Sequence, residues 1–202
     1  MRSPPDARLS ATLAALERLG PAHDAAEPDR RRKLLNITPD TGPLLSLLVR
    51  ATRARRVLEL GTSNGYSTLW LADAVRDTGG RVTTIELLED KAALARDTFQ
   101  RAGVAEVVDL RVADAGAVLQ AAPDATYEFV FIDTDRERYA AWWPDLARVL
   151  APGGLLVVDN ATSHAADVAP FAAAVAATPG VTTALVPVGN GELLVHKGAT
   201  AR

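Results

Sequence analysis

Short apolar runs alternate with amphipathic stretches over most of the chain, from Arg56 onward. Several runs are apolar nearly throughout, which is typical of strands in a parallel sheet that helices cover on both faces. Helical patterns follow the first five runs. The predicted strands are VLEL (57–60), RVTTIE (81–86), VVDLRV (107–112), EFVFID (128–133), GLLVVD (154–159), VTTALVPV (181–188) and ELLVHK (192–197).

The last two runs are separated by Gly189-Asn190-Gly191, a hairpin signal, so the sheet should finish with an antiparallel strand. The pattern predicts a doubly wound, Rossmann-like α/β fold with a mostly parallel seven-stranded sheet.

The first 52 residues predict a helical extension in front of an α/β core at 53–202, within one domain. LSATLAALERLG predicts a helix from Leu9 to Leu19 that Gly20-Pro21 should stop. EPDRRRKLLNI (27–37) predicts a second helix, with its proline in the first turn. TPDTGPLLSLLVRATRA (38–54) predicts a third, which leads into the first strand.

Composition limits the classes of function. A chain of 202 residues with 48% hydrophobic and 23% charged residues can bury a core of ordinary size. Its net charge of −3 gives no reason to expect nucleic acid as a partner, and the absence of cysteine excludes disulfides and thiolate metal sites. No apolar stretch is long enough to span a membrane, and MRSPPDARLS has no signal-peptide core, so we expect a cytoplasmic enzyme.

A glycine-rich turn joins the first core strand to its helix in VLELGTSNGYSTLWLA (57–72). In such a sheet, ligands bind beyond the carboxyl ends of the strands at the topological switch point. Gly61 and Gly65 permit close backbone approach, but their spacing differs from the G-x-G-x-x-G of dinucleotide loops. Acidic Glu59 on the strand suits a cationic ligand better than a pyrophosphate, which disfavours a dinucleotide oxidoreductase.

Two more acids follow the next strands. Glu86 ends the second strand and can accept both hydroxyls of a ribose. Asp114 follows the third and can accept from an exocyclic amine such as that of adenine. Taken singly, Glu86 can be an exposed strand end and Asp114 a helix N-cap. Their shared position at strand ends favours a ligand site.

Asp133 and Asp159 end the fourth and fifth strands, and Asn160 follows directly. Neighbouring strands lie about 4.8 Å apart, so these side chains can reach one ion. Two carboxylates and an amide oxygen are hard ligands that suit Mg²⁺. The alternative is structural, with Asp159-Asn160 turning the chain and Asp133 capping a helix.

The motifs LELGTSNGYS, IE, ADA, FIDTDRERY and VVDN, in this order, resemble the S-adenosylmethionine-dependent O-methyltransferases related to catechol and caffeoyl-CoA O-methyltransferases. The resemblance runs from about Ile37 to the closing VGNGELLVHK. It implies a divalent cation, Mg²⁺ or another, held by Asp133, Asp159 and Asn160 and chelating a vicinal diol. Members of the family it resembles are often dimers, so the resemblance implies a homodimer.

The resemblance places further residues around S-adenosylmethionine. These are Glu59, Gly61, Thr62 and Ser67 at the methionine part and the turn, Glu86 at the ribose, Asp114 and Ala115 at the adenine, Ile37 on the N-terminal side, and Asp135 at a cofactor-contacting acid.

Arg136 departs from the family, whose matching position commonly carries a lysine proposed as general base. A guanidinium stays protonated and cannot take that proton. Three explanations remain open: the metal suffices and Arg136 only stabilises a phenolate, His164 in DNATSH is the base, or the acceptor is not a catechol. His164 should begin a helix after a Ser163 cap; it can also be an ordinary loop histidine.

Tyr139, Trp142 and Trp143 pack their helix on the sheet, form an oligomer contact or form an aromatic wall for an acceptor. Tyr66 belongs either to a shelf for the cofactor or to the core. We interpret the chain as an O-methyltransferase that methylates a small, aromatic vicinal diol with divalent-metal assistance. The alternatives are a metal-independent methyltransferase of the same fold acting on another small molecule, and a non-catalytic cofactor-binding protein.

Overall fold

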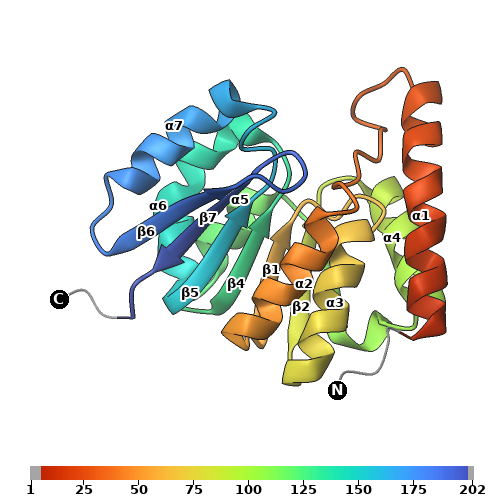
Figure 1. The fold of residues 1–202 in the computed structure, drawn as a ribbon, viewed down its shortest axis with the longest axis horizontal. Helices are drawn as coiled ribbons and strands as arrows, with labels where there is room; N and C mark the ends of the chain where they lie inside the picture. The colour runs from red at the N-terminus through yellow and green to blue at the C-terminus, as the bar shows by residue number, and fades with distance from the viewer. Residues whose placement is uncertain (1–5, 200–202) are drawn as a thin grey trace.

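The computed structural model describes residues 6–199 and shows a seven-stranded sheet between two layers of helices (Figure 1). The strand order is β3-β2-β1-β4-β5-β7-β6, and β7 is antiparallel to both of its neighbours. The sheet therefore confirms the predicted fold class. Its strands are β1 (Arg56–Leu60), β2 (Arg81–Glu86), β3 (Val108–Val112), β4 (Tyr127–Ile132), β5 (Leu150–Val158), β6 (Val181–Val186) and β7 (Glu192–Lys197).

The helices divide between the two faces of the sheet (Figure 1). On the first face lie α1 (Ala7–Ala26), α2 (Thr41–Thr52), α3 (Tyr66–Thr78) and α4 (Glu89–Ala102). On the second lie α5 (Ala115–Ala121), α6 (Tyr139–Val149) and α7 (Ala165–Ala176), and two 3-10 turns, η1 (Ala105–Val107) and η2 (Arg136–Arg138), connect elements. Alternation along β4 serves both layers, because Phe131 packs toward the first and Ile132 toward the second.

Two predictions for the N-terminal region are wrong. The first helix does not stop at Gly20-Pro21 but continues to Ala26 as α1. Residues 27–37 form no helix; a turn at 30–32 leads into a segment without regular secondary structure. The segment is held by the Asp24 carboxylate, which accepts the backbone N–H groups of Leu34 and Leu35 at 2.6 and 2.8 Å.

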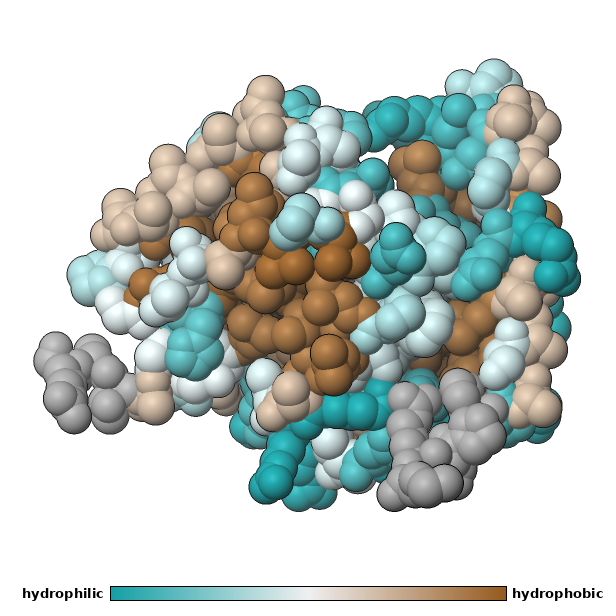
Figure 2. Space-filling model, in the orientation of Figure 1, coloured by the Kyte–Doolittle hydropathy of each residue, from teal (hydrophilic) through white to brown (hydrophobic). Residues whose placement is uncertain are grey.

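An apolar area lies over the part of the sheet that α1–α4 leave uncovered. Figure 2 shows it beside α2, over β5 and β7. On α2, Leu47 is 63% exposed, and on β6 Leu185 is 57% exposed. The homodimer expected from the sequence stays a prediction.

Within residues 6–199, no helix is long and apolar enough to cross a membrane.

The pairing of β4 with β5 brings the two strand-end aspartates to the same edge. The strands are parallel with Ile132 opposite Val158, and Asp133 and Asp159 come directly after these residues. The backbone N–H of Asp159 donates to the carbonyl of Ile132 at 3.2 Å, which extends the ladder by one bond. The predicted adjacency of the two strands is confirmed.

Candidate functional site

The switch point of the sheet lies between β1 and β4, because the chain runs outward from β1 to β3 and then returns to β4. Gly61, directly after β1, has a φ of +101°. A side chain there would place its Cβ 2.1 Å from the backbone carbonyl oxygen of Asp133. Glycine is therefore required at this crossing on two counts, its backbone conformation and the close approach of β4. The loop after β1 and the first strand-end aspartate form one compact edge.

Glu59 lies beneath this loop rather than at its surface. Its side chain is fully buried, and its oxygens accept hydroxyl bonds from Ser67 at 2.6 Å, Thr68 at 2.5 Å and Thr84 at 2.6 Å. Burial raises the pKa of Glu59 to about 7, against these three hydroxyls, which lower it. The carboxyl group thus ties the start of α3 to β1 and β2.

The raised pKa of Glu59 predicts a loss of stability with rising pH. The contribution of protonated Glu59 to the free energy of unfolding is fully present below the ordinary pKa of 4.5. It is lost as the pH rises through about 7, which lowers the free energy of unfolding by about 3 kcal/mol. Urea unfolding at pH 5 and pH 8 should therefore show a smaller pH dependence in Glu59→Gln than in the wild type. Exposed Glu89 on α4 supplies the control Glu89→Gln. Equal pH dependence in both variants and the wild type would contradict the effect.

Glu86 ends β2 and is also nearly buried. Its carboxylate accepts backbone N–H groups from Ser63 at 2.8 Å, Leu87 at 2.9 Å and Leu88 at 3.0 Å. These bonds fix the carboxylate at the carboxyl edge, beside the glycine loop. A carboxylate has about four acceptor positions, so Glu86 retains capacity for a hydroxyl of a ligand.

The remaining residues assigned to the cofactor lie in different surroundings. Thr62 is buried, with its hydroxyl 2.6 Å from that of Thr84. Ile37 is buried in the first-face apolar cluster, and Asp135 is exposed at the start of η2. Asp114 caps α5 by accepting the backbone N–H of Ala117 at 3.0 Å, as the N-cap interpretation predicts, and its contact with adenine stays a prediction.

Asp133, Asp159 and Asn160 are brought together as the sequence predicts. The Asn160 amide nitrogen donates to Asp133 Oδ1 at 3.1 Å and to Asp159 Oδ2 at 2.8 Å. Asn160 has a φ of +66°, a left-handed conformation that asparagine tolerates. Its amide oxygen faces the other way, toward the side chains of Ser163 (3.2 Å) and Asn190 (3.3 Å).

The sequence did not reveal a third carboxyl group, Glu192. It begins β7, which lies antiparallel beside β5, so the start of β7 meets the carboxyl edge. Glu192 is fully buried and accepts the Thr41 hydroxyl at 2.9 Å through Oε1. Burial and the charge of Asp159 raise its pKa to about 9. An acid directly after the hairpin glycine was the only available signal.

The aspartates also hold protons more tightly than usual. Removal from water is the main reason that the pKa values of Asp133 and Asp159 are raised, and the charge of Asp159 raises that of Asp133 further. The charge of Arg136 acts in the opposite direction on both. Acidic groups therefore crowd this edge with Arg136 beside them, an arrangement that favours a bound cation.

Arg136 lies in η2 with its side chain mostly buried, and its Nε is 3.5 Å from Asp167 Oδ2. His164 occupies the N-cap position of α7 itself, without a side-chain cap bond, so the predicted Ser163 cap is wrong. The Ser163 hydroxyl instead lies 3.0 Å from His164 Nδ1 and donates to Asn160. His164 is thus linked to the aspartate pair only through two intervening side chains.

The aromatic residues are structural. Tyr139 is fully buried, and its ring packs on Trp142 and Phe171 with centroids 6.2 and 6.0 Å away. Trp143 packs edge-on against Phe171 at 5.6 Å. Tyr66 is buried and donates to Glu17 on α1 at 2.7 Å. These contacts favour the packing role over an acceptor wall or a cofactor shelf.

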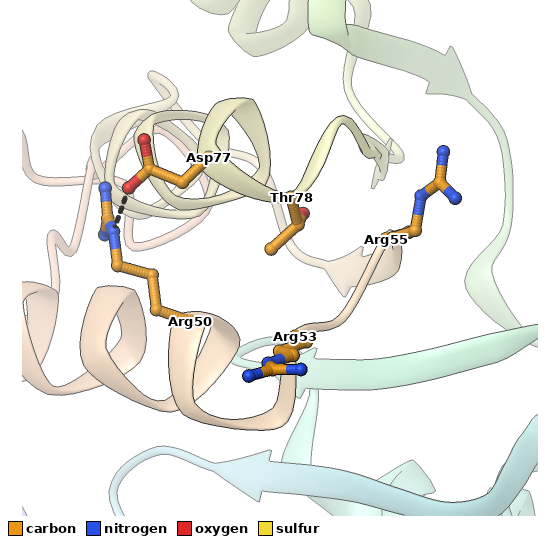
Figure 3. A pocket seen from close by; sticks show the side chains of 5 residues that line it. All are labelled: Arg50, Arg53, Arg55, Asp77 and Thr78. Atoms are coloured by element: carbon orange, nitrogen blue, oxygen red, sulfur yellow. Dashed lines mark hydrogen bonds and ion pairs between the residues drawn. The ribbon is translucent and has the colours of Figure 1, made fainter.

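A hollow of about 480 Å³ lies elsewhere, where α2 and α3 end and β1 begins (Figure 3). Its lining residues are Arg50, Arg53, Arg55, Asp77 and Thr78. Arg50 is paired with Asp77 at 2.5 Å, as the dashed line in Figure 3 shows. The hollow lies at the amino edge of the parallel strands and takes no part in the site at their carboxyl edge.

Comparisons with known proteins show the family of the chain. Residues 23–198 match the O-methyltransferase family. The chain is similar to a catechol O-methyltransferase of Mycobacterium tuberculosis, with 40% identity over 166 residues that cover 78% of this chain and 72% of that protein. A solved O-methyltransferase from Bacillus cereus in complex with SAH is 27% identical and has a TM-score of 0.77, over 96% of this chain and 92% of that one.

A second solved relative, the O-methyltransferase from Streptomyces achromogenes involved in tomaymycin synthesis, was determined in complex with SAM. It is 28% identical with a TM-score of 0.76, over 96% of this chain and 90% of that one. The chain therefore belongs to the O-methyltransferase family that its motifs resemble.

Proposed function

We propose that this chain transfers a methyl group from S-adenosylmethionine to one hydroxyl of a small aromatic vicinal diol, with the help of a divalent cation such as Mg²⁺. The observation that carries the proposal is the meeting of Asp133, Asp159 and Asn160 at the carboxyl edge beside the switch point. Relatives solved with SAM or SAH support the cofactor. The similar catechol O-methyltransferase supports the acceptor class.

The donor set fits a divalent cation. Among residues 6–199 no cluster of three or more His, Cys, Asp or Glu has metal-binding geometry, and the proposed set includes only two such residues with an amide. Burial raises the pKa values of both carboxyl groups, and the charge of Arg136 offsets this only in part, so a divalent cation would stabilise their charged forms. For the Asn160 amide to serve as an oxygen ligand it must turn, because its nitrogen now faces the carboxylates. Ser163 can accept from the turned amide, since a hydroxyl both donates and accepts.

A bound divalent cation supplies Lewis acidity, which lowers the pKa of a hydroxyl that coordinates it. Asp133 and Asp159, in their anionic forms, would hold the cation. Arg136 adds a permanent positive charge beside both and would stabilise a phenolate. Glu86 would fix the ribose, and the edge would orient the acceptor oxygen in line with the sulfonium methyl group.

The acceptor class is tested by methyl transfer from S-adenosylmethionine to catechol, guaiacol and phenol in Mg²⁺, with products identified by mass spectrometry. Catechol offers two adjacent oxygens to the cation, whereas each control offers one free hydroxyl. We expect catechol to be methylated at least about tenfold faster than either control, since a site built for a second hydroxyl rejects the analogue without it. Comparable turnover of phenol would contradict the diol and favour a metal-independent enzyme of the same fold.

A further inference from the structure

An ion pair links the two sides of the switch point at the second face of the sheet. Asp114 follows β3, whereas Arg138 ends η2, which follows β4. In the sheet β3 and β4 are separated by β2 and β1, a span of about 14 Å at the usual strand spacing. Arg138 Nη1 nevertheless lies 2.6 Å from Asp114 Oδ2, and Nη2 lies 3.3 Å from Oδ1. The two-point pairing joins elements that flank the ends of β1 and β2.

The guanidinium of Arg138 stacks on the ring of Trp142. Its central carbon lies 4.6 Å from the ring centroid of Trp142, which is itself largely buried on α6. Gly116 leaves room for this stack, since a Cβ there would come within 2.8 Å of Trp142 Nε1 and 3.2 Å of Arg138 Nη2. The arginine therefore has a stacked, defined position although its side chain is 42% exposed.

Asp114 is held at two points by these neighbours. Its Oδ1 accepts the backbone N–H of Ala117, and both oxygens accept from Arg138. The hydrogen bond from Arg138 is the main reason that the pKa of Asp114 is lowered. Asp114 therefore stays an anion that only accepts hydrogen bonds, and its orientation depends on Arg138.

We propose that Arg138 is a positioning residue for the adenine end of the cofactor, which holds the Asp114 carboxylate where it accepts the exocyclic amine. The proposal rests on the proposed use of S-adenosylmethionine. Arg136 and Arg138 both belong to η2. In this proposal Arg136 acts on the metal side of the edge, and Arg138 acts on the cofactor side. Arg138 touches neither the methyl group nor the acceptor in this arrangement.

The test is calorimetric titration with S-adenosylhomocysteine and with S-inosylhomocysteine, in which a carbonyl replaces the exocyclic amine. The wild type should prefer S-adenosylhomocysteine at least about tenfold, because a hydrogen bond to a charged group is lost with the inosine analogue. Arg138→Met should bring this ratio close to one, and Arg138→Lys should restore part of it. With saturating cofactor, kcat of Arg138→Met should stay within about twofold, with the loss confined to KM.

Arg148 on α6 supplies the matched control, since it also reaches toward α5, donating to the carbonyls of Leu119 and Ala122 at 2.8 and 2.7 Å. Arg148→Met should leave the ratio unchanged. If Arg138→Met does not fold, Asp114→Asn gives a second readout, since its amide can donate to the inosine carbonyl and should lower or invert the preference.

Different results overturn different claims. An unchanged preference in Arg138→Met, an equal loss in Arg148→Met, or no preference in the wild type would overturn the role of Arg138 while leaving the methyltransferase intact. Failure of the wild type to bind S-adenosylhomocysteine at all would overturn the proposed function together with this role.

Discussion

Asp159→Asn is expected to lower kcat/KM for a catechol by roughly 10²–10⁴-fold in Mg²⁺, because a lost metal site forfeits several kcal/mol of transition-state stabilisation. Asp159 is almost fully buried at the end of β5 and lies within reach of the same amide as Asp133. Its replacement leaves one carboxylate, which binds a divalent cation far less tightly than two. Methyl transfer and Mn²⁺ binding should fall together.

The variant should nevertheless fold. The negative charges of Asp159 and Asp133 raise the pKa of Glu192, and that of Asp159 also raises the pKa of Asp133, so replacing Asp159 relieves repulsion in the metal-free protein. The melting temperature in EDTA should therefore equal or exceed that of the wild type. Asp97→Asn, at an exposed site on α4, is the control and should change neither activity nor metal binding. Full activity of Asp159→Asn would remove the basis of the metal site.

Arg136→Met is expected to lower kcat by about 10²-fold, comparable to the loss of one donor that stabilises a developing oxyanion. The positive charge of Arg136 lowers the pKa of both Asp133 and Asp159, so it would also stabilise a negatively charged oxygen held between them. Arg136→Lys keeps the charge and should stay within about tenfold of the wild type. Steady-state rates from pH 6 to pH 9 measure both variants.

Arg136→Lys distinguishes two roles for this position, a fixed positive charge and a general base. If catalysis needed a base at this position, Arg136→Lys would raise the rate by roughly 10²–10⁴-fold and add an ionisation to the pH profile.

His164→Gln tests the other candidate for the general base. Because His164 reaches the aspartates only through Ser163 and Asn160, we expect less than a tenfold loss. A loss beyond a hundredfold would identify His164 as the base.

Much of the sheet was predictable because strand patterns here depend on local sequence. Uninterrupted apolar runs such as FVFI fixed β4 to within one residue, and Gly189-Asn190-Gly191 gave the β6–β7 hairpin. The strand-end acids followed from the same pattern, since parallel strands present their carboxyl ends at one edge.

The N-terminal helices were less predictable because distant contacts determine them. Gly20 does not end α1; it gives the Asn36 side chain room to approach, since a Cβ there would lie 2.7 Å from its amide nitrogen. Pro21 is accommodated inside the helix. The segment after α1 is held by Asp24, whose carboxylate accepts backbone N–H groups that would otherwise donate to carbonyls within a helix.

Glu192 was missed for a related reason. Its place beside Asp159 depends on β7 inserting between β5 and β6, a topology that the alternation of apolar residues does not encode. The orientation of the Asn160 amide was likewise beyond the sequence, because it depends on the charges that surround it.

The central claim is that a divalent cation at Asp133, Asp159 and Asn160 enables methyl transfer. The most direct measurement is transfer of labelled methyl from S-adenosylmethionine to catechol by the wild type, in EDTA and after addition of excess Mg²⁺. The account predicts a rate at least about 10²-fold lower in EDTA that Mg²⁺ restores. Equal turnover in EDTA and in Mg²⁺ would contradict the metal mechanism and leave a methyltransferase that works without it.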